Sequence, residues 1–192
     1  MSQNLLPHSG TANYYGQILN NTTDYFIELL DTTAWQHDEV VIFGKRIVTA
    51  RKVAWYADNG ITYTYSNSTK HGLAWTKPLL KLKAEAEKLA GVAFNSCLLN
   101  LYHNGNEGMG WHSDNEKTIV ANSPIASFSF GAERKFVFKH KQTKESVSVM
   151  LENGSCLIMK GETQTHWLHS LPKATKITSP RVNLTFRVMK TD

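Results

Sequence analysis

The chain has 192 residues, of which 41% are hydrophobic and 19% are charged, and it carries a formal net charge of +5. These values predict one globular domain. Proline is too sparse for a disordered linker, and two cysteines are too few for a disulfide scaffold or a cysteine-rich zinc site. The moderate positive charge favours an anionic partner but does not identify one.

Neither export nor membrane insertion is predicted. The N-terminal segment lacks a basic start followed by an apolar core, and no run of about 18 apolar residues occurs. Cys97 and Cys156 are expected to be buried free thiols. We therefore expect a cytoplasmic protein, or a nuclear one in a eukaryote, that acts as a monomer without a protein partner.

Two amphipathic helices are predicted in the first half of the chain. In residues 21–35, NTTDYFIELLDTTAW, apolar side chains recur at helical spacing after a cap at Thr22 or Thr23. In residues 76–91, TKPLLKLKAEAEKLAG, a proline can occupy the first turn and Gly91 can end the helix. Both helices are interpreted as supports whose apolar sides face a core.

The rest of the chain predicts an antiparallel β-sandwich or barrel. Period-two or short apolar segments dominate from about residue 95 onwards, and the turn sequence ENGS at 152–155 predicts a hairpin. Two earlier segments also have strand character. The predicted strands are 39–46, 61–67, 124–131, 135–141, 146–151, 155–161 and 181–188.

The stretch GWHSDNE, residues 110–116, contains a candidate for two metal ligands. In an extended segment, His112 and Asp114 project to the same side, where imidazole and carboxylate could bind one ion. With a distant third histidine they would form the facial triad of non-haem Fe(II) sites. The third ligand could be His166 or His169, which lie on opposite faces of a regular strand, so the spacing alone does not choose between them.

The segment PRVNLTFRV, residues 180–188, has one apolar and one polar face. Arg181, Asn183, Thr185 and Arg187 share the polar face. That face could be a solvated exterior, or it could line a cavity where an arginine binds a carboxylate through two hydrogen bonds. Asn100 and Tyr102 in the segment NLY form a similar polar pair that could bind the same acid, unless Tyr102 only packs in a sheet.

These motifs together resemble the AlkB family of Fe(II)/2-oxoglutarate dioxygenases. The motifs NLY, GWHSDNE, SPIASFSFGAERKFVFKHK, HWLHSLP and PRVNLTFR occur in the order of that family, between about residues 40 and 189. FGKR and ARK are similar to the members that act on duplex DNA. The resemblance implies an α+β, mainly β protein in which a double-stranded β-helix (jelly-roll) core, about 96–190, follows N-terminal helices and a nucleotide-recognition lid, about 1–95.

The resemblance also implies the ligand set and the reaction. Iron would be bound by His112, Asp114 and His169, the last preferred because it precedes SLP. O2 and 2-oxoglutarate would yield succinate, CO2 and an oxidant that hydroxylates an N-methyl group, which then leaves as formaldehyde. Arg187 would pair with the distal carboxylate of 2-oxoglutarate, and Arg181 would lie near the iron-bound keto acid. The implied 2-oxoglutarate residues are Asn100, Tyr102, Arg181, Asn183 and Arg187.

A stacked base cannot reach a buried iron, so the substrate base must be extruded or single-stranded. The resemblance implies that Tyr65 stacks on the base opposite His112, with Tyr63 nearby, and that Glu116 meets the base edge. Phe43 would fill the gap left by the base, and Arg51 would reach the opposite strand. Otherwise the tyrosines pack in a sheet and Glu116 is a solvated charge.

The predicted function is oxidative demethylation of N-alkylated bases, such as 1-methyladenine and 3-methylcytosine, in double-stranded DNA. RNA or protein substrates, and a catalytically silent β-barrel that binds nucleic acid, are alternatives. A basic run at 133–144 is either a solvated face or a phosphate contact, with Lys139 and Lys141 expected on one basic exterior.

Overall fold

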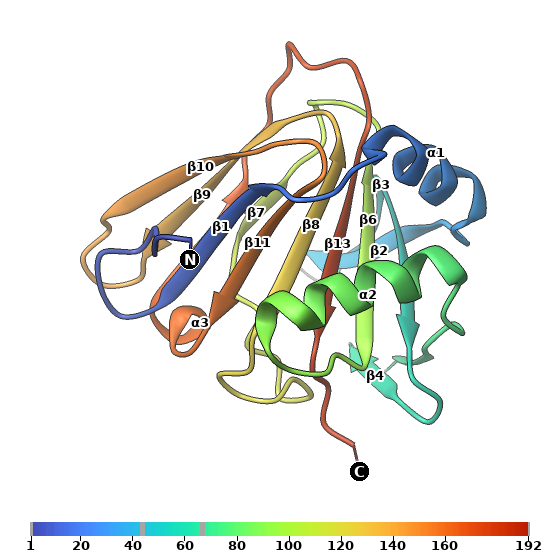
Figure 1. Cartoon of the computed structure of the whole chain (residues 1–192), viewed down its shortest axis with the longest axis horizontal. Helices are drawn as coiled ribbons and strands as arrows, with labels where there is room; N and C mark the ends of the chain where they lie inside the picture. The colour runs from blue at the N-terminus through green and yellow to red at the C-terminus, as the bar shows by residue number, and fades with distance from the viewer. Residues whose placement is uncertain (1, 43–44, 66–67, 192) are drawn as a thin grey trace.

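The computed structural model describes residues 2–42, 45–65 and 68–191, without the side chains of 40–42, 45–47, 63–65 and 68–70. Figure 1 shows two antiparallel sheets stacked against each other, with helices α1 and α2 on the outer face of the larger sheet. The helices are α1 (Thr22–Thr32), α2 (Lys77–Ala90) and the short α3 (Thr163–His166). No helix in the described part of the chain is long and apolar enough to cross a membrane.

The larger sheet has seven strands and the smaller has four. Across the larger sheet the order is β1 (Thr11–Gln17), β11 (Ser155–Lys160), β8 (Ile125–Gly131), β13 (Arg181–Arg187), β6 (Ser96–Tyr102), β3 (Lys45–Ala57), β2 (Gln36–Ile42). Across the smaller sheet it is β10 (Ser146–Leu151), β9 (Arg134–His140), β12 (Trp167–Leu171), β7 (Met109–His112). A separate pair consists of β4 (Thr62–Tyr65) and β5 (Ser68–His71).

The chain repeatedly crosses between the two sheets from β7 to β13. Strands β7, β9, β10 and β12 belong to the smaller sheet, whereas β8, β11 and β13 belong to the larger one. This alternation is the double-stranded β-helix, so the predicted jelly-roll fold class is confirmed. The larger sheet also extends beyond residues 96–190, because β1, β2 and β3 come from the N-terminal part of the chain.

The prediction that ENGS closes a hairpin is wrong. The turn itself is present, with the amide of Ser155 donating to the carbonyl of Glu152 at 3.2 Å. However, β10 pairs with β9, while β11 pairs with β1 and β8 in the other sheet. A local turn sequence specifies that the chain reverses, but burial of the two apolar strand faces decides which strands pair.

The two predicted helices are present and cover one hydrophobic core. Leu29 of α1 and Leu79 and Leu82 of α2 are buried in the same cluster as Phe128 and Phe186 of the larger sheet. The second helix ends at Gly91 with a φ of 74°, a backbone conformation that glycine adopts without strain. The larger sheet is thereby supported from outside, and its other face is available for the site.

The start of the first helix differs from the prediction. Its cap position is Asn21, with a φ of 57°, and no side chain there makes a capping hydrogen bond. The hydroxyl of Thr22 instead accepts a hydrogen bond from the amide of Asn153 at 3.0 Å. The hydroxyl that was expected to cap the helix therefore ties it to the turn between β10 and β11.

Candidate active site

The three predicted metal ligands come together between β7 and β12. His112 and His169 are paired positions across these neighbouring strands, and their ring centroids lie 4.2 Å apart. Asp114 follows β7, and one ligand atom from each of the three residues lies within 4.8 Å of the others. Asp114 and His169 are buried at 6% and 3% exposure. Such a cluster could hold one metal ion.

The hydrogen bonds and charges keep these side chains in forms that bind metals. Nδ1 of His112 donates to the carbonyl of Gly110 at 2.8 Å, which leaves Nε2 as the lone-pair nitrogen, 3.9 Å from Asp114 Oδ1. Burial lowers the pKa of His169 to about 4, so its ring is neutral near pH 7. Burial opposes ionisation of Asp114, but the guanidinium of Arg187 and, at acidic pH where they are protonated, the imidazoles of His169 and His112 lower its pKa to about 2.

His166 is not part of this cluster. It ends α3, its ring stacks on His140 at a centroid distance of 6.1 Å, and its Nε2 lies 3.8 Å from Glu162 Oε2. The short helix turns the chain before β12, so the two histidines do not alternate along one strand. The position of His169 beside His112 and Asp114 identifies it as the third candidate metal ligand, which the sequence spacing alone could not do.

A cavity of about 610 Å³ opens beside the metal-ligand cluster, between the two sheets. Its walls include all three ligands and the polar face of β13. Because β13 is a central strand of the larger sheet and its residues are buried or half-buried, the solvated-exterior interpretation of PRVNLTFRV is wrong. Asn183 is paired with Asn100 and Arg181 with Tyr102, so the predicted polar groups share this wall.

Arg181 is a buried cation at the wall of the cavity. Nη2 donates to the hydroxyl of Ser129 at 2.9 Å, and the guanidinium lies 5.5 Å from the centroid of the Tyr102 ring. Nε is buried and has no hydrogen-bond partner among the described residues. Burial lowers the pKa of Arg181 to about 10. A buried cation with an unused donor fits an anionic ligand.

Arg187 lies at the metal-ligand cluster. Nη2 donates to Oδ2 of Asp114 at 3.0 Å. The two arginines are six positions apart on β13, about 20 Å along an extended strand. The expectation that Arg181 lies at the metal end of the keto acid and Arg187 at its distal carboxylate is therefore wrong, because Arg187 is the arginine that contacts a metal ligand. The direction in which β13 enters the site could not be predicted from the sequence.

The residues expected to contact the substrate are only partly described. Glu116 is exposed and lines the cavity. Phe43 lies outside the described residues, as do the side chains of Tyr63 and Tyr65, whose backbone belongs to β4. Their roles remain predictions.

Arg51 lines the cavity from β3. Its side chain is 11% exposed, forms an ion pair with Asp38, and donates through Nη1 to the sulfur of Met109 at 3.5 Å. No sequence pattern predicts this ion pair, since Asp38 and Arg51 are brought together by the pairing of β2 with β3. The structure thus places Arg51 at the cavity wall.

The basic run at 133–144 does not form one cationic face. Arg134 is buried and donates to the carbonyls of Glu107 and Pro172, both at 2.8 Å. Lys139 lies over the ring of exposed Trp111, 4.2 Å from its centroid. Lys141 follows the end of β9 and donates to neutral acceptors beside Asp114, so the expectation that it shares an exterior with Lys139 is wrong.

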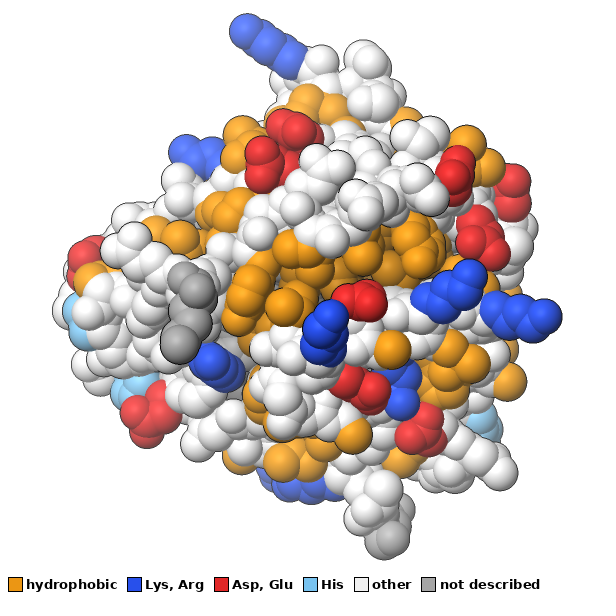
Figure 2. All heavy atoms as spheres, in the orientation of Figure 1, with side chains coloured by type: hydrophobic (Ala, Val, Ile, Leu, Met, Phe, Trp, Pro, Cys, Tyr) orange, Lys and Arg blue, Asp and Glu red, His pale blue; other side chains and the backbone are white. Residues whose placement is uncertain are grey.

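Among the described residues, the face of the molecule that carries α2 likewise shows no concentration of positive charge (Figure 2). Figure 2 shows Lys and Arg side chains interspersed with Asp and Glu side chains around hydrophobic patches on that face. The net charge of +5 therefore does not mark this face as a binding surface for an anion.

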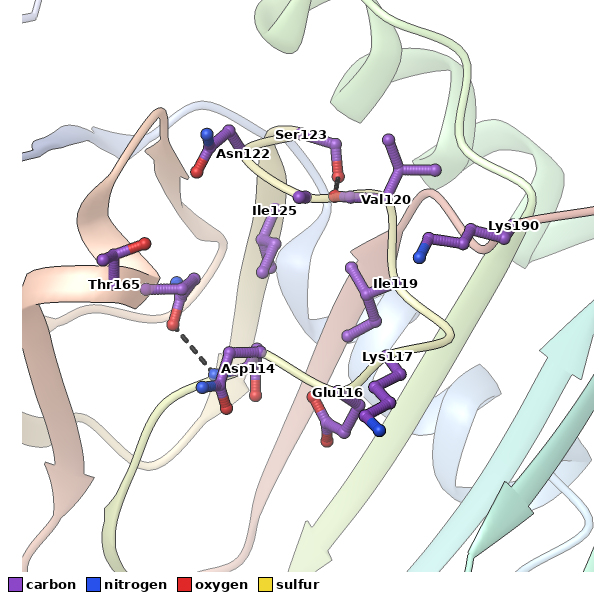
Figure 3. A pocket seen from close by; sticks show the side chains of 13 residues that line it. Asp114, Glu116, Lys117, Ile119, Val120, Asn122, Ser123, Ile125, Thr165 and Lys190 are labelled. Carbon is purple, nitrogen blue, oxygen red and sulfur yellow. Dashed lines mark hydrogen bonds between the residues drawn. The ribbon is translucent and has the colours of Figure 1, made fainter.

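A second, smaller pocket of about 170 Å³ adjoins the metal-ligand cluster. It is bordered by the segment 114–123 and by Gln164 and Lys190. In Figure 3 the side chains of Ile119 and Ile125 point into it. Asp114 and Glu116 border both this pocket and the larger cavity, so the loop that carries them forms the wall between the two.

Comparison with known proteins agrees with this arrangement. The sequence profile of the 2OG-Fe(II) oxygenase superfamily matches residues 13–187. DNA oxidative demethylase ALKBH2 of Bos taurus is 43% identical over 156 residues, 77% of this chain and 56% of that protein. ALKBH2 of Arabidopsis thaliana is 35% identical over 192 residues, 85% of this chain and 61% of that protein.

A further curated relative is alpha-ketoglutarate-dependent dioxygenase alkB homolog 3 of Bos taurus, 40% identical over 152 residues, 74% of this chain and 52% of that protein. The chain thus spans about half to three fifths of the length of these relatives.

A solved structure of OsALKBH1 gives a TM-score of 0.63 over 98% of this chain and 100% of that chain, at 16% identity. At that identity the likeness concerns the fold alone. The profile and the curated relatives carry the assignment: the chain belongs to the 2OG-Fe(II) oxygenase superfamily and, within it, to the AlkB family.

Proposed function

We propose that the chain is an Fe(II)- and 2-oxoglutarate-dependent dioxygenase that removes alkyl groups from N-alkylated bases in DNA, such as 1-methyladenine and 3-methylcytosine. One observation carries the proposal: His112, Asp114 and His169 line the same cavity as the arginines of β13. Coupled oxidation of a keto acid and a second substrate requires such a shared chamber. The choice of DNA is supported by the relatives named DNA oxidative demethylases.

His112, Asp114 and His169 would hold the iron. Two imidazoles and one carboxylate match the facial triad, which leaves coordination positions open for other ligands. Bound iron, with 2-oxoglutarate and O2, supplies the oxidation of a C–H bond in the alkyl group and releases succinate and CO2. The chain contributes a neutral His169 and an ionised Asp114, which are the protonation states that bind metals.

The polar wall of β13 would bind 2-oxoglutarate. Arg187 is held at Asp114, so it would face the end of the keto acid nearest the metal, and Arg181 would pair with the distal carboxylate. A guanidinium can form two parallel hydrogen bonds with a carboxylate, and burial strengthens them by excluding water. Asn100, Tyr102 and Asn183 are the neighbouring polar groups on this wall.

The outer part of the cavity would receive the base. The total volume of about 610 Å³ exceeds what a five-carbon dicarboxylate fills. Glu116 is exposed and lines the cavity, where a carboxylate favours the positive charge of a base such as 1-methyladenine.

The chemistry of dealkylation is balanced without a further reactant. One oxygen atom is inserted into a C–H bond of the N-methyl group, and the resulting N–CH2OH group then breaks at its C–N bond. The base nitrogen keeps the bonding electron pair, the hydroxyl proton leaves, and formaldehyde departs. The restored base is neutral, so it loses its attraction to Glu116.

A base in a duplex must be extruded before its alkyl group can reach the cavity. We assign Phe43 to the gap that the base leaves, and Tyr63 and Tyr65 to the side of the extruded base. Arg51 would leave its ion pair with Asp38 at the cavity wall to reach the opposite strand. Stacking on aromatic side chains stabilises an unpaired base by about 1–3 kcal/mol, which offsets part of the cost of unpairing. These residues define the preference for double-stranded DNA.

The function is tested by measuring formaldehyde released from an oligonucleotide that contains 1-methyladenine. Release should require Fe(II) and 2-oxoglutarate, and His112→Ala should abolish it. His166→Ala is the matched control, because that imidazole lies outside the metal-ligand cluster and should leave release intact. Formaldehyde release that persists in folded His112→Ala would contradict the proposed site.

The substrate class is tested by comparing rates on the same lesion in double-stranded DNA, single-stranded DNA and RNA. The fastest rate is expected on double-stranded DNA, and Phe43→Ala should lower that rate more than the rate on single strands. Faster turnover on RNA would overturn the duplex assignment. Binding of DNA without any consumption of 2-oxoglutarate would instead indicate a catalytically silent binding protein.

A further inference from the structure

The segment that carries the metal ligand Asp114 is not held by a sheet. Strand β7 ends at His112, and residues 113–116 belong to no helix or strand. One side of the segment faces the larger cavity and the other borders the smaller pocket seen in Figure 3. With a pocket on each side, packing alone does not fix the backbone of this segment, so hydrogen bonds must hold it. The Asp114 carboxylate itself accepts from Arg187.

Two side chains, Gln164 and Lys141, supply hydrogen bonds to Ser113 and to the backbone of Asp114. Oε1 of Gln164, in α3, accepts from the backbone amide of Asp114 at 2.9 Å, which is the dashed line that ends at Asp114 in Figure 3. Nζ of Lys141 donates to the hydroxyl of Ser113 at 3.1 Å and to the backbone carbonyl of Gln164 at 2.7 Å. Lys141 therefore bonds both to the segment that carries Asp114, through Ser113, and to α3, through Gln164.

The same two residues are tied to the third metal ligand. The helix that contains Gln164 runs directly into β12, which carries His169. The amide of Lys141 donates to the carbonyl of His166 at 2.8 Å, and Nε2 of Gln164 contacts the sulfur of Met159 at 3.5 Å. Thus the contact links the segment carrying Asp114 to the element carrying His169.

We infer that Lys141 and Gln164 are positioning residues of the metal site, which lock Ser113 and Asp114 against α3 and so fix the Asp114 carboxylate relative to His169. Among the described residues, Nζ of Lys141 is hydrogen-bonded to the neutral oxygens of Ser113 and Gln164, so it holds this contact without an ion pair to a metal ligand, and its charge favours the neutral form of His169. Outer partners of this kind typically change metal affinity by about 10–100-fold when removed. The inference rests on the proposed metal role of the three ligands and does not depend on the substrate.

The test is Mn(II) binding to the chain after metal removal. The concentration of free Mn(II) is measured from its electron paramagnetic resonance signal. Lys141→Met and Gln164→Ala should each raise the dissociation constant by about 10–100-fold. Lys139→Met and Gln142→Ala are matched controls, since Lys139 lies over Trp111 and Gln142 is exposed. Both controls should bind Mn(II) as the parent does.

Thermal unfolding in chelator separates positioning from a general structural role. The metal-free midpoints of Gln164→Ala and the parent should be close, while the rise in midpoint caused by Mn(II) should shrink. If Lys141→Met folds poorly, Lys141→Arg, which keeps donors at that place, should regain both folding and affinity. Unchanged Mn(II) affinity in Gln164→Ala and Lys141→Met overturns the inference, whereas a parent that binds no Mn(II) counts against the proposed metal site itself.

Discussion

At the scale of single residues, burial decides which side chains of the site are charged. His169 is 3% exposed and its pKa falls to about 4, because an imidazolium ion there would lose its hydration. Asp114 is equally enclosed, yet it stays ionised because Arg187 donates to its Oδ2. The same environment therefore keeps one ligand neutral and the other anionic.

The pH dependence of stability follows from these shifts. Between about pH 6.5 and 4 the unfolded chain binds a proton at His169 that the native state does not, so acidification should lower the free energy of unfolding. Asp114 contributes stability that is complete above its ordinary pKa of 3.8 and is lost as the pH falls towards about 2. Urea unfolding of metal-free protein between about pH 7 and 5 measures the first effect.

His169→Gln should reduce that pH dependence, because glutamine does not titrate. A part should remain, since burial also lowers the pKa of His140. His37→Gln, at an exposed position, serves as the control and should keep the slope of the parent. Equal slopes in His169→Gln and the parent would show that another group causes the effect.

At the scale of elements, the two faces of β13 have different roles: the apolar face stabilises the core, and the polar face lines the cavity. Phe186 is fully buried in the cluster that packs under α2, while Arg181 faces the cavity from the other side. Alternation along a strand is strict, so the sequence alone defined which residues share a face. Which face met the cavity was decided by tertiary packing, because the apolar face packs in the core cluster with α1 and α2 and leaves the polar face to the cavity.

Substitutions on the two faces should therefore have different effects. Phe186→Ala should lower the free energy of unfolding by about 3–5 kcal/mol, because it leaves a cavity in the core. Arg181→Met should raise the KM for 2-oxoglutarate by about 10–100-fold, the loss expected for a charge-assisted hydrogen bond of about 1.5–3 kcal/mol.

The free energy of unfolding of Arg181→Met should stay close to that of the parent, since replacing a buried cation by an apolar side chain removes a desolvation cost. Urea unfolding and steady-state kinetics measured on the same preparations check both variants. An unchanged KM in Arg181→Met would remove Arg181 from the cosubstrate site.

At the scale of the whole molecule, the site exists only where the two sheets face each other. The metal ligands come from the smaller sheet and the segment after it, whereas Arg181, Asn183 and Arg187 come from the larger sheet. A ligand that contacts both sheets stabilises the native state by mass action, since the unfolded chain cannot bind it.

Metal and cosubstrate should therefore raise the unfolding midpoint together. At about 100 times the dissociation constant, a ligand adds about 2.7 kcal/mol to the free energy of unfolding. Thermal unfolding with Mn(II) and 2-oxoglutarate should show this rise, and a chelator should reverse it. His112→Ala should lose the metal-dependent part, and a rise that survives in this variant would place the metal elsewhere.

Local sequence determined what depends on near neighbours: the helices that begin near residue 22 and end at Gly91, the alternating faces of β13, and the His112 and Asp114 pair. Tertiary structure decided which elements meet. It paired His169 with His112, and it made the ENGS turn connect strands of two different sheets. It also placed Arg187 rather than Arg181 at Asp114, and it placed Lys141, expected on the exterior, beside the metal-ligand cluster. The physical reason is that periodicity fixes side-chain direction within an element, while burial of apolar faces between the sheets fixes neighbours far apart in sequence.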